Sequence, residues 1–426
     1  MVRIQLGIDE PKDKRQPRLP FPLEEFKGAY AGNGFNMIFR PRAFPRDKDG
    51  KLIKDTVKAE DGVKDNVLQV NLTTEQWTFG PTLGEIPNRG LENQGDINLG
   101  GLPYLQTVQD VTNEASGRGD RLPTDKPNGI HLEPGVFLAV PGSGTTGGTS
   151  IVRMASIPHG TTINAQGLAP DKNAKRSRRP DFNKHVIDTT PFDIGDPSKR
   201  KTNPKFFPNM IAERPNNELR EPKDLSKFTD KTGGTGRITT EIIKNPNLVL
   251  EKATEGQEII DTVTFSLSTG PSKIPNDPSL ASHVSGGGGI ANISFLKPNA
   301  EVELMTNTWW VETVLYDVKI QGPLSGGETV KEVWATMPEV SVPGQTGKKQ
   351  ASLAPTPVFS ITAPPGGFKD KEKTLKVPGI QLQYSQTVNL NFKGLTWPHV
   401  SVATLVPTAP QRIVMKADGS VVRVAA

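Results

Sequence analysis

QLQYSQTVNLNF at residues 381–392 and HVSVATLVP at residues 399–407 decide the fold class of this chain. In the first stretch the even positions are apolar except Gln386, and the odd positions are polar. Because side chains on a strand alternate between two faces, this pattern predicts a half-buried antiparallel strand. Its even face should be buried, and its odd face should be exposed or face another wet surface. Pro398 cannot donate to a ladder, so the next strand should begin near His399.

The amino-acid composition predicts a chain rich in turns. Glycine and proline number 42 and 38 in 426 residues, which favours short strands joined by loops. The absence of cysteine excludes disulfides, thiolate metal ligands and cysteine nucleophiles. The sequence has no apolar run of the roughly 18 residues that a membrane span needs, and its start lacks the order of a signal peptide. We therefore expect a cytoplasmic protein with no membrane span.

The formal net charge of +5 comes from one segment of the chain. Residues 171–205 contain ten Lys and Arg residues against five Asp residues. Such a segment can bind an anionic partner, or it can be a solvated insertion. Neither interleaved aromatic residues nor a nucleic-acid-binding motif accompanies it, so we interpret it as a solvated insertion and expect no nucleic-acid partner.

The remaining sequence predicts a single all-β domain over residues 1–426. About ten segments alternate in the manner of strands, which indicates an antiparallel β-barrel of about ten strands with long loops. The basic insertion should lie outside this barrel, because its proline and charge content cannot fill a core. The predicted regions outside the barrel strands are an N-terminal arm at 1–20, the basic irregular insertion at 171–236, a short helical segment at 238–256 and an irregular loop at 325–351.

His399 is the strongest candidate for a metal ligand. Its neighbours on the same predicted strand face, Ser401 and Ala403, are small and leave room for a flat group over the imidazole. An axial ligand of a metalloporphyrin needs such room, and imidazole is a common iron ligand where thiolate is unavailable. The alternative is a pocket or turn histidine bonded to the backbone.

Three stretches of the sequence carry a resemblance to a known family. The motif Gly28-x-Tyr30-x-Gly32-x-Gly34 is similar to the opening strand of nitrobindin-like and fatty-acid-binding-protein-like haem barrels, with tyrosine where they have tryptophan. GIHLEPG at 129–135 and RMASIPHGTTINAQG at 153–167 resemble a hairpin of that family, and residues 382–407 resemble its last two strands. The resemblance implies a barrel that holds haem b non-covalently, with His399 in the place of the proximal histidine.

Further residues are expected around this cofactor. An acid–base pair on the open side would be Arg153 with His159; His159 could instead be the iron ligand itself or an ordinary turn histidine. His131 could equally be an edge histidine paired with Glu133. The residues expected in contact with the macrocycle are Tyr384, Trp397, Leu405, His131 and Met154.

These features predict a haem-binding protein whose open iron position binds small gases or anions, or reacts with peroxide as a peroxidase does. The main alternative is a non-enzymatic carrier that holds a fatty acid or another apolar molecule inside the barrel. A third class, a structural protein that binds through its basic segment, predicts a barrel without a cavity. The sequence leaves a homo-oligomer open.

Overall fold

The computed structural model describes most of the chain, and the account below is confined to that part. The described residues are 19–41, 66–88, 96–113, 128–141, 148–158, 160–187, 238–269, 301–341, 346–392 and 395–424.

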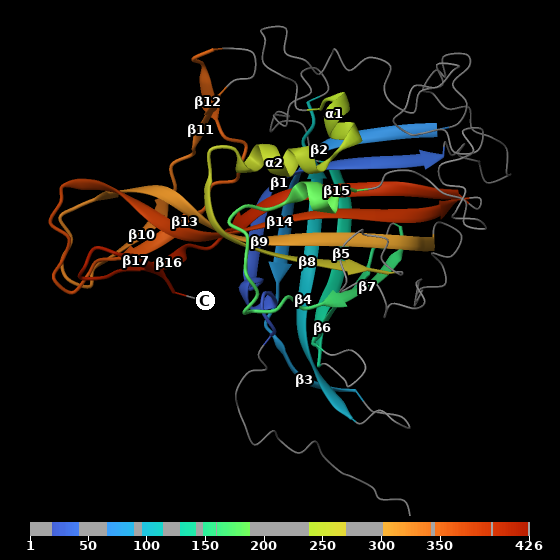
Figure 1. Ribbon diagram of the computed structural model, residues 1–426, viewed down its shortest axis with the longest axis horizontal. Coiled ribbons are helices and arrows are strands. Elements are labelled where there is room, and N and C mark those ends of the chain that lie inside the picture. Colours follow the sequence, from blue (N-terminus) through green and yellow to red (C-terminus); the bar gives the residue numbers. More distant parts are fainter. Residues whose placement is uncertain are drawn as a thin grey trace, which may run out of the picture.

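Ten antiparallel strands form a closed barrel (Figure 1). Neighbouring strands follow the order β2-β1-β15-β14-β9-β8-β7-β6-β5-β4, and pairing of β4 with β2 closes the ring. The prediction of an all-β antiparallel barrel of about ten strands is therefore confirmed. The strands are β1 Gly28–Pro41, β2 Asn66–Phe79, β4 Ile97–Asp110, β5 Asn128–Val140, β6 Ser150–Ser156, β7 Thr162–Leu168, β8 Glu258–Ser268, β9 Glu301–Gln321, β14 Glu372–Phe392 and β15 Leu395–Pro407; a short strand β3, Leu83–Asn88, pairs with β4 outside the ring.

Within the described residues, the shortest ladder of the ring joins β7 to β8 and consists of one pair, Gln166 with Ser268. Instead of a longer ladder, β8 contacts the chain that follows β7: the backbone N–H of Thr262 donates to the carbonyl of Ser177 over 2.8 Å. Arg176 forms an ion pair with Asp261 at 2.6 Å. Residues 171–179, which we call the strap, thus fasten the outer edge of β8.

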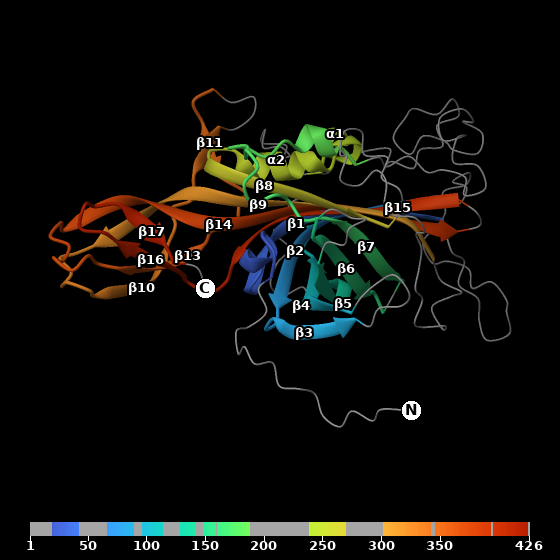
Figure 2. The ribbon, with the colours of Figure 1, turned by 60° about the horizontal axis from the view of Figure 1, so that its bottom comes forward.

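Two helices cover the outer face of one half of the barrel. They are α1 Thr240–Lys244 and α2 Asn247–Thr254; α2 packs over β15 and β1, and α1 lies next to α2 (Figures 1 and 2). They confirm the predicted helical segment at 238–256. Neither helix has the length or apolar character of a membrane-spanning helix. The apolar cluster beneath them consists of Phe35, Met37, Leu72, Phe182, Ile187, Ile238, Ile242, Ile243, Leu250, Trp310, Val400 and Val402.

The burial predicted for the odd face of β14 is wrong. Residues 381–390 are buried on both faces. Asn389 is only 2% exposed, less than Leu390 at 5%. The odd face lies under α2, where the amide of Gln383 donates to the carbonyl of Leu250 at 3.1 Å. A polar face is therefore buried because a helix from a distant part of the sequence covers it and accepts a hydrogen bond from Gln383.

The basic insertion agrees with its prediction as far as it is described. Residues 171–187 contain turns and a 3-10 helix, η2 Phe182–His185, and supply no strand to the barrel. Phe182 and Ile187 add to the outer apolar cluster. Residues 188–236, and residues 1–18 of the predicted N-terminal arm, lie outside the described residues.

The barrel carries a second, smaller core. β9 and β14 are 21 residues long each and extend beyond the ring, to the left in Figure 1. Four short strands, β10 Thr329–Trp334, β13 Val358–Thr362, β16 Gln411–Met415 and β17 Val421–Arg423, form a sheet that packs on this extension. Residues 325–351, predicted to be an irregular loop, contain β10 together with the pair β11 Glu339–Ser341 and β12 Lys349–Ala351. That prediction is corrected: β10 forms because the extended ends of β9 and β14 offer a surface on which it packs, and β11 and β12 form a separate two-stranded sheet.

The glycines of β1 are needed because neighbouring strands approach closely. Gly32 lies opposite Leu405 of β15 and Glu75 of β2, on the interior face. A Cβ atom on Gly32 would overlap the carbonyl oxygen of Thr404, which is backbone and has little freedom to move. The curvature of β1 between its neighbours thus depends on a missing side chain.

We predict that Gly32→Ala lowers the free energy of unfolding by about 3 kcal/mol, the upper part of the usual cost of overpacking. Gly84→Ala is the matched control, because a Cβ atom on Gly84 meets nothing within 4 Å; its effect should stay within about 0.5 kcal/mol. Urea unfolding monitored by tryptophan fluorescence measures both. Equal effects of the two substitutions would contradict the explanation given for β1.

Candidate functional site

One end of the barrel interior is closed by apolar side chains. The 3-10 helix η1, Leu23–Glu25, places Leu23 and Phe26 in the interior core. The ring of Phe26 packs on Phe79, with ring centroids 5.4 Å apart, and on Trp309 at 5.1 Å. This end is therefore part of the hydrophobic core.

The middle of the interior contains a buried ion pair. Arg153 of β6 and Glu133 of β5 are both fully buried, with a guanidinium nitrogen 2.6 Å from Glu133 Oε1. The same guanidinium donates to Tyr104 at 2.8 Å, to Asn307 at 2.9 Å and to Gln386 at 2.6 Å. All of its nitrogens therefore have acceptors, which a buried arginine requires.

Glu133 remains ionised in this environment. Burial alone opposes its charge, but the charge of Arg153 and the hydrogen bonds from His131 and Tyr104 outweigh burial and lower the pKa of Glu133 to about 2. His131 Nε2 lies 3.2 Å from Glu133 Oε2, and the Tyr104 hydroxyl donates to Glu133 Oε1. The expected alternative for His131, pairing with Glu133, is thus what the structure shows.

A second buried carboxyl group, that of Glu75, belongs to the same level of the interior, and its pKa is shifted in the direction opposite to that of Glu133. Burial raises the pKa of Glu75, and hydrogen bonds from Tyr384, Gln106 and Trp77 counter this only in part. The Tyr384 hydroxyl donates to Glu75 Oε2 over 2.6 Å, and the Gln106 amide donates to the same oxygen over 3.2 Å. No cation pairs with Glu75 among these contacts, which is why burial dominates its pKa.

Aromatic rings fill the space around these polar groups. Trp309 and Tyr384 have ring centroids 4.9 Å apart, and Trp77 lies 5.2 Å from Trp309 and 5.0 Å from Tyr104. The guanidinium carbon of Arg153 lies 5.2 Å from the Trp77 ring centroid. We call this packed level the floor layer; it is formed by Glu75, Trp77, Tyr104, Gln106, Glu133, Arg153, Asn307, Trp309, Tyr384 and Gln386. A ligand inside the barrel finds this level already occupied.

Beyond the floor layer the interior face becomes polar. This polar end, where β1 ends and β15 begins (to the right in Figure 1), contains Gln69, Asn71, Asn36, Ser401 and His399. His399 is half-buried and lies opposite Ile38 of β1 and Val388 of β14. Asn36 donates to Ser401 Oγ at 2.9 Å. Four of these five inward-facing side chains keep exposed surface, whereas Asn71 is buried.

The structure separates several residues that the sequence analysis placed together. Tyr384 and Leu405 are fully buried, and Leu405 stands six residues beyond His399 on β15, about 20 Å along the strand. Leu405 therefore packs at the apolar end, not beside His399. Met154 lies between the inward-facing Arg153 and Ala155, so it is on the outer face of β6 and not in the interior.

Two other predicted residues are described incompletely or not at all. Trp397 pairs with Leu390 in the β14–β15 ladder, and its side chain lies outside the described residues. His159 lies outside them altogether.

Arg153 was expected on the open side, but it is fully buried in the floor layer. Its guanidinium is held by Glu133 and the side-chain oxygens around it, so that expectation is corrected.

The sequence analysis missed Glu75, Gln106 and Tyr104. A usable signal existed in β2, where Glu75 is two residues from Trp77 and so shares its strand face. A carboxyl group on the same face as a large apolar ring indicates a buried acid.

Across the described ranges, no three His, Cys, Asp or Glu side chains come together as a group that could hold a metal ion.

Comparison of the chain with protein-family models, with curated proteins and with solved structures found no match.

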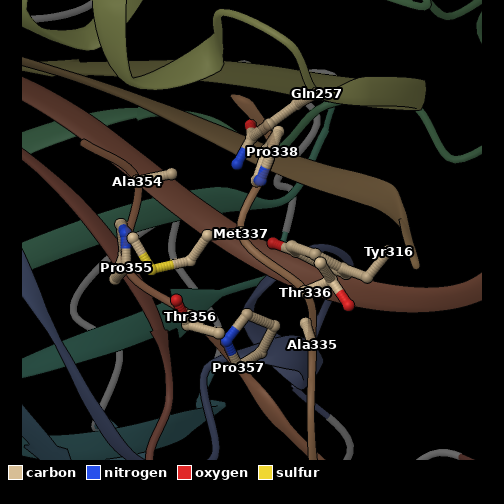
Figure 3. A pocket seen from close by; sticks show the side chains of 10 residues that line it. All are labelled: Gln257, Tyr316, Ala335, Thr336, Met337, Pro338, Ala354, Pro355, Thr356 and Pro357. Carbon is tan, nitrogen blue, oxygen red and sulfur yellow. The ribbon is translucent and has the colours of Figure 1, made fainter. Parts of the chain in front are cut away.

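A small hollow lies outside the barrel, beside the smaller core (Figure 3). It is lined by Gln257, Tyr316 and residues 335–338 and 354–357. Gln257 is hydrogen-bonded to Gln381, whose amide also donates to the fully buried carboxyl group of Glu312 at 2.6 Å. Burial raises the pKa of Glu312 to about 8, although the bond from Gln381 opposes this.

We predict that Glu312→Gln stabilises the protein at alkaline pH and leaves it unchanged at pH 4. The pKa of Glu312 is about 8 in the folded state and near 4.3 in unfolded chains, so the folded state alone holds the proton between these values. The unfolding free energy of the wild type should therefore fall as pH rises through this window, by about 5 kcal/mol in total. Urea titrations of both proteins from pH 4 to pH 9 measure the difference, and a gap that does not change with pH would contradict the prediction.

The ion pair in the floor layer gives a separate prediction. Arg153→Met leaves the Glu133 charge buried and uncompensated, so it should lower the unfolding free energy by about 3 to 5 kcal/mol. The double variant Arg153→Met/Glu133→Gln removes that charge as well and should recover part of the loss. Thermal and urea unfolding of the wild type and the two variants test this. A double variant less stable than Arg153→Met would show that the loss of stability does not come from the unpaired charge of Glu133.

Proposed function

We propose that this protein binds haem b non-covalently at the polar end of the barrel, with the His399 imidazole as the axial ligand of the iron. The observation that carries the proposal is the position of His399. It lies on the interior face of β15, half-buried, on the far side of a floor layer that closes the rest of the barrel. Histidine serves as an axial ligand of haem iron, and the Nε2 atom of His399 is enclosed in the barrel interior.

The strand neighbours of His399 include aliphatic side chains that could pack against a flat ligand. Its neighbours across the two ladders, Ile38 and Val388, are aliphatic, and its face-mates Ser401 and Ala403 are small. A porphyrin supplies four ligands to its iron, so the protein needs to add only one imidazole. When bound, haem supplies an open coordination position for small ligands such as nitric oxide or peroxide.

The proposal covers binding and does not extend to peroxidase turnover. Arg153, expected as part of an acid–base pair, donates all its hydrogen bonds within the floor layer. Tyr384 is likewise committed to Glu75. The alternative of an apolar cargo in the centre of the barrel meets the same obstacle, since rings and the ion pair occupy that level. A haem at the polar end also agrees with the resemblance of the sequence to nitrobindin-like barrels.

The test is titration of the purified protein with ferric haem, followed by the Soret band. His399→Ala should weaken haem binding at least tenfold and shift the Soret band. Loss of a residue that only supports a metal ligand already lowers metal affinity by about 10- to 100-fold, and loss of the ligand itself should cost no less. Added imidazole should restore the wild-type band in His399→Gly. His185→Ala is the control, since His185 lies outside the barrel, against Trp310.

Circular dichroism establishes that each variant keeps its β-structure. An unchanged Soret band in folded His399→Ala, with loss of the band in His159→Ala, would move the ligand to the other strand pair. Haem binding that no histidine substitution alters would refute axial ligation by this chain.

A further inference from the structure

The strap carries more positive charge than its surroundings neutralise. Residues 171–179 contain five Lys and Arg residues and one acid, Asp171. Two of the five cations have an acidic partner: Arg176 pairs with Asp261 at 2.6 Å, and Lys172 lies 4.0 Å from Glu24. The remaining three cations are exposed and form no ion pair within the described ranges; they are Lys175, Arg178 and Arg179. Five cations against three acids leave an excess of two positive charges on this surface.

The backbone that carries these cations is held in place by hydrogen bonds. The carbonyl of Ser177 accepts from the backbone N–H of Thr262 at 2.8 Å, and the carbonyl of Arg178 accepts from the Thr262 hydroxyl at 3.2 Å. The Ser177 hydroxyl donates to the carbonyl of Arg179. These bonds use main-chain oxygens of the two arginines and not their guanidinium groups. Because the main chain is already ordered, a ligand does not bear the cost of ordering it.

Arg176 differs from the other cations of the strap in being fully used by the fold. Its guanidinium carbon lies 4.6 Å from the centroid of the Phe21 ring. The same group donates to the carbonyl of Lys172 at 3.1 Å and to the carboxylate of Asp261. Arg176 therefore fastens the strap to the barrel, and the cations left for a ligand are the three unpaired ones.

We propose that Lys175, Arg178 and Arg179 form a binding surface for a soluble ligand that carries several phosphate groups. A guanidinium group presents a planar fork of donors that matches the oxygens of a phosphate. Hydrogen bonds between charged groups are also stronger than those between neutral ones. The surface lies on the outside of the barrel, so this binding goes beyond the haem binding proposed above and does not depend on it.

The spacing of the cations favours linked phosphates over other anions. Three cations within residues 175–179 span at most about 14 Å of chain. Linked phosphates place more negative charge in that span than an extended acidic peptide, whose side chains repeat on one face about every 7 Å. The strap contains no aromatic residue on which a nucleic-acid base could stack. A short chain of phosphates is therefore the ligand class that fits this surface best.

Isothermal titration calorimetry of the full-length protein with inorganic tripolyphosphate at low ionic strength tests the proposal. The double variant Arg178→Gln/Arg179→Gln should bind tripolyphosphate at least tenfold more weakly than the wild type, the effect of one lost hydrogen bond to a charged group. The matched control is Lys369→Gln/Lys371→Gln, which removes the same charge from exposed positions between β13 and β14 and should bind as the wild type does. Added salt should weaken binding to the wild type, because the contacts are exposed to solvent.

Three results would overturn the proposal. Absence of tripolyphosphate binding to the wild type would show that the strap is only a solvated segment. Equal weakening in the two double variants would show an effect of net charge alone. Strap-dependent binding to phosphatidylserine vesicles without binding of tripolyphosphate would assign the surface to lipid headgroups. The strap variant should keep the circular dichroism spectrum of the wild type, because the fold uses the carbonyls of Arg178 and Arg179 and not their side chains.

Discussion

The buried ion pair between Arg153 and Glu133 is the interaction on which the interior of the barrel depends. Neither charge could be buried alone, because the desolvation of an isolated ion costs more than a small domain's whole stability margin. Together they draw Tyr104, Asn307 and Gln386 into fixed positions. These residues come from β4, β5, β6, β9 and β14, so one guanidinium joins strands on opposite sides of the ring.

The ion pair and the aromatic rings around it fill the middle of the barrel and so limit where a ligand could fit. The floor layer separates an apolar end, closed by Leu23 and Phe26, from a polar end with half-buried side chains. Gly135 shows how tightly the layer is fitted, because a Cβ atom there would overlap the Tyr104 ring. The space left for a ligand in this interior would be at the polar end, where His399, Asn36 and Asn71 lie on neighbouring strands.

The sequence predicted what depends on local pattern. The alternation in residues 381–392 gave the strand, and the small side chains of Ser401 and Ala403 marked the face that His399 shares. Features formed by distant residues could not be read in this way. Arg153 bonds to Gln386, 233 residues away, so nothing near Arg153 indicated a buried charge. The polar face of β14 looked solvent-exposed because the helices that cover it come from another part of the chain.

Within the described part of the chain a single pair joins β7 to β8, and every other junction of the ring has a longer ladder. We therefore expect the described hydrogen bonds at this junction to open more readily than those of the other ladders. Ser177 and Arg176 of the strap bind the edge of β8 at this junction. The unpaired backbone groups of an exposed strand edge can pair with a strand of another molecule. By covering the outer edge of β8, the strap should hinder pairing of this strand with a second molecule.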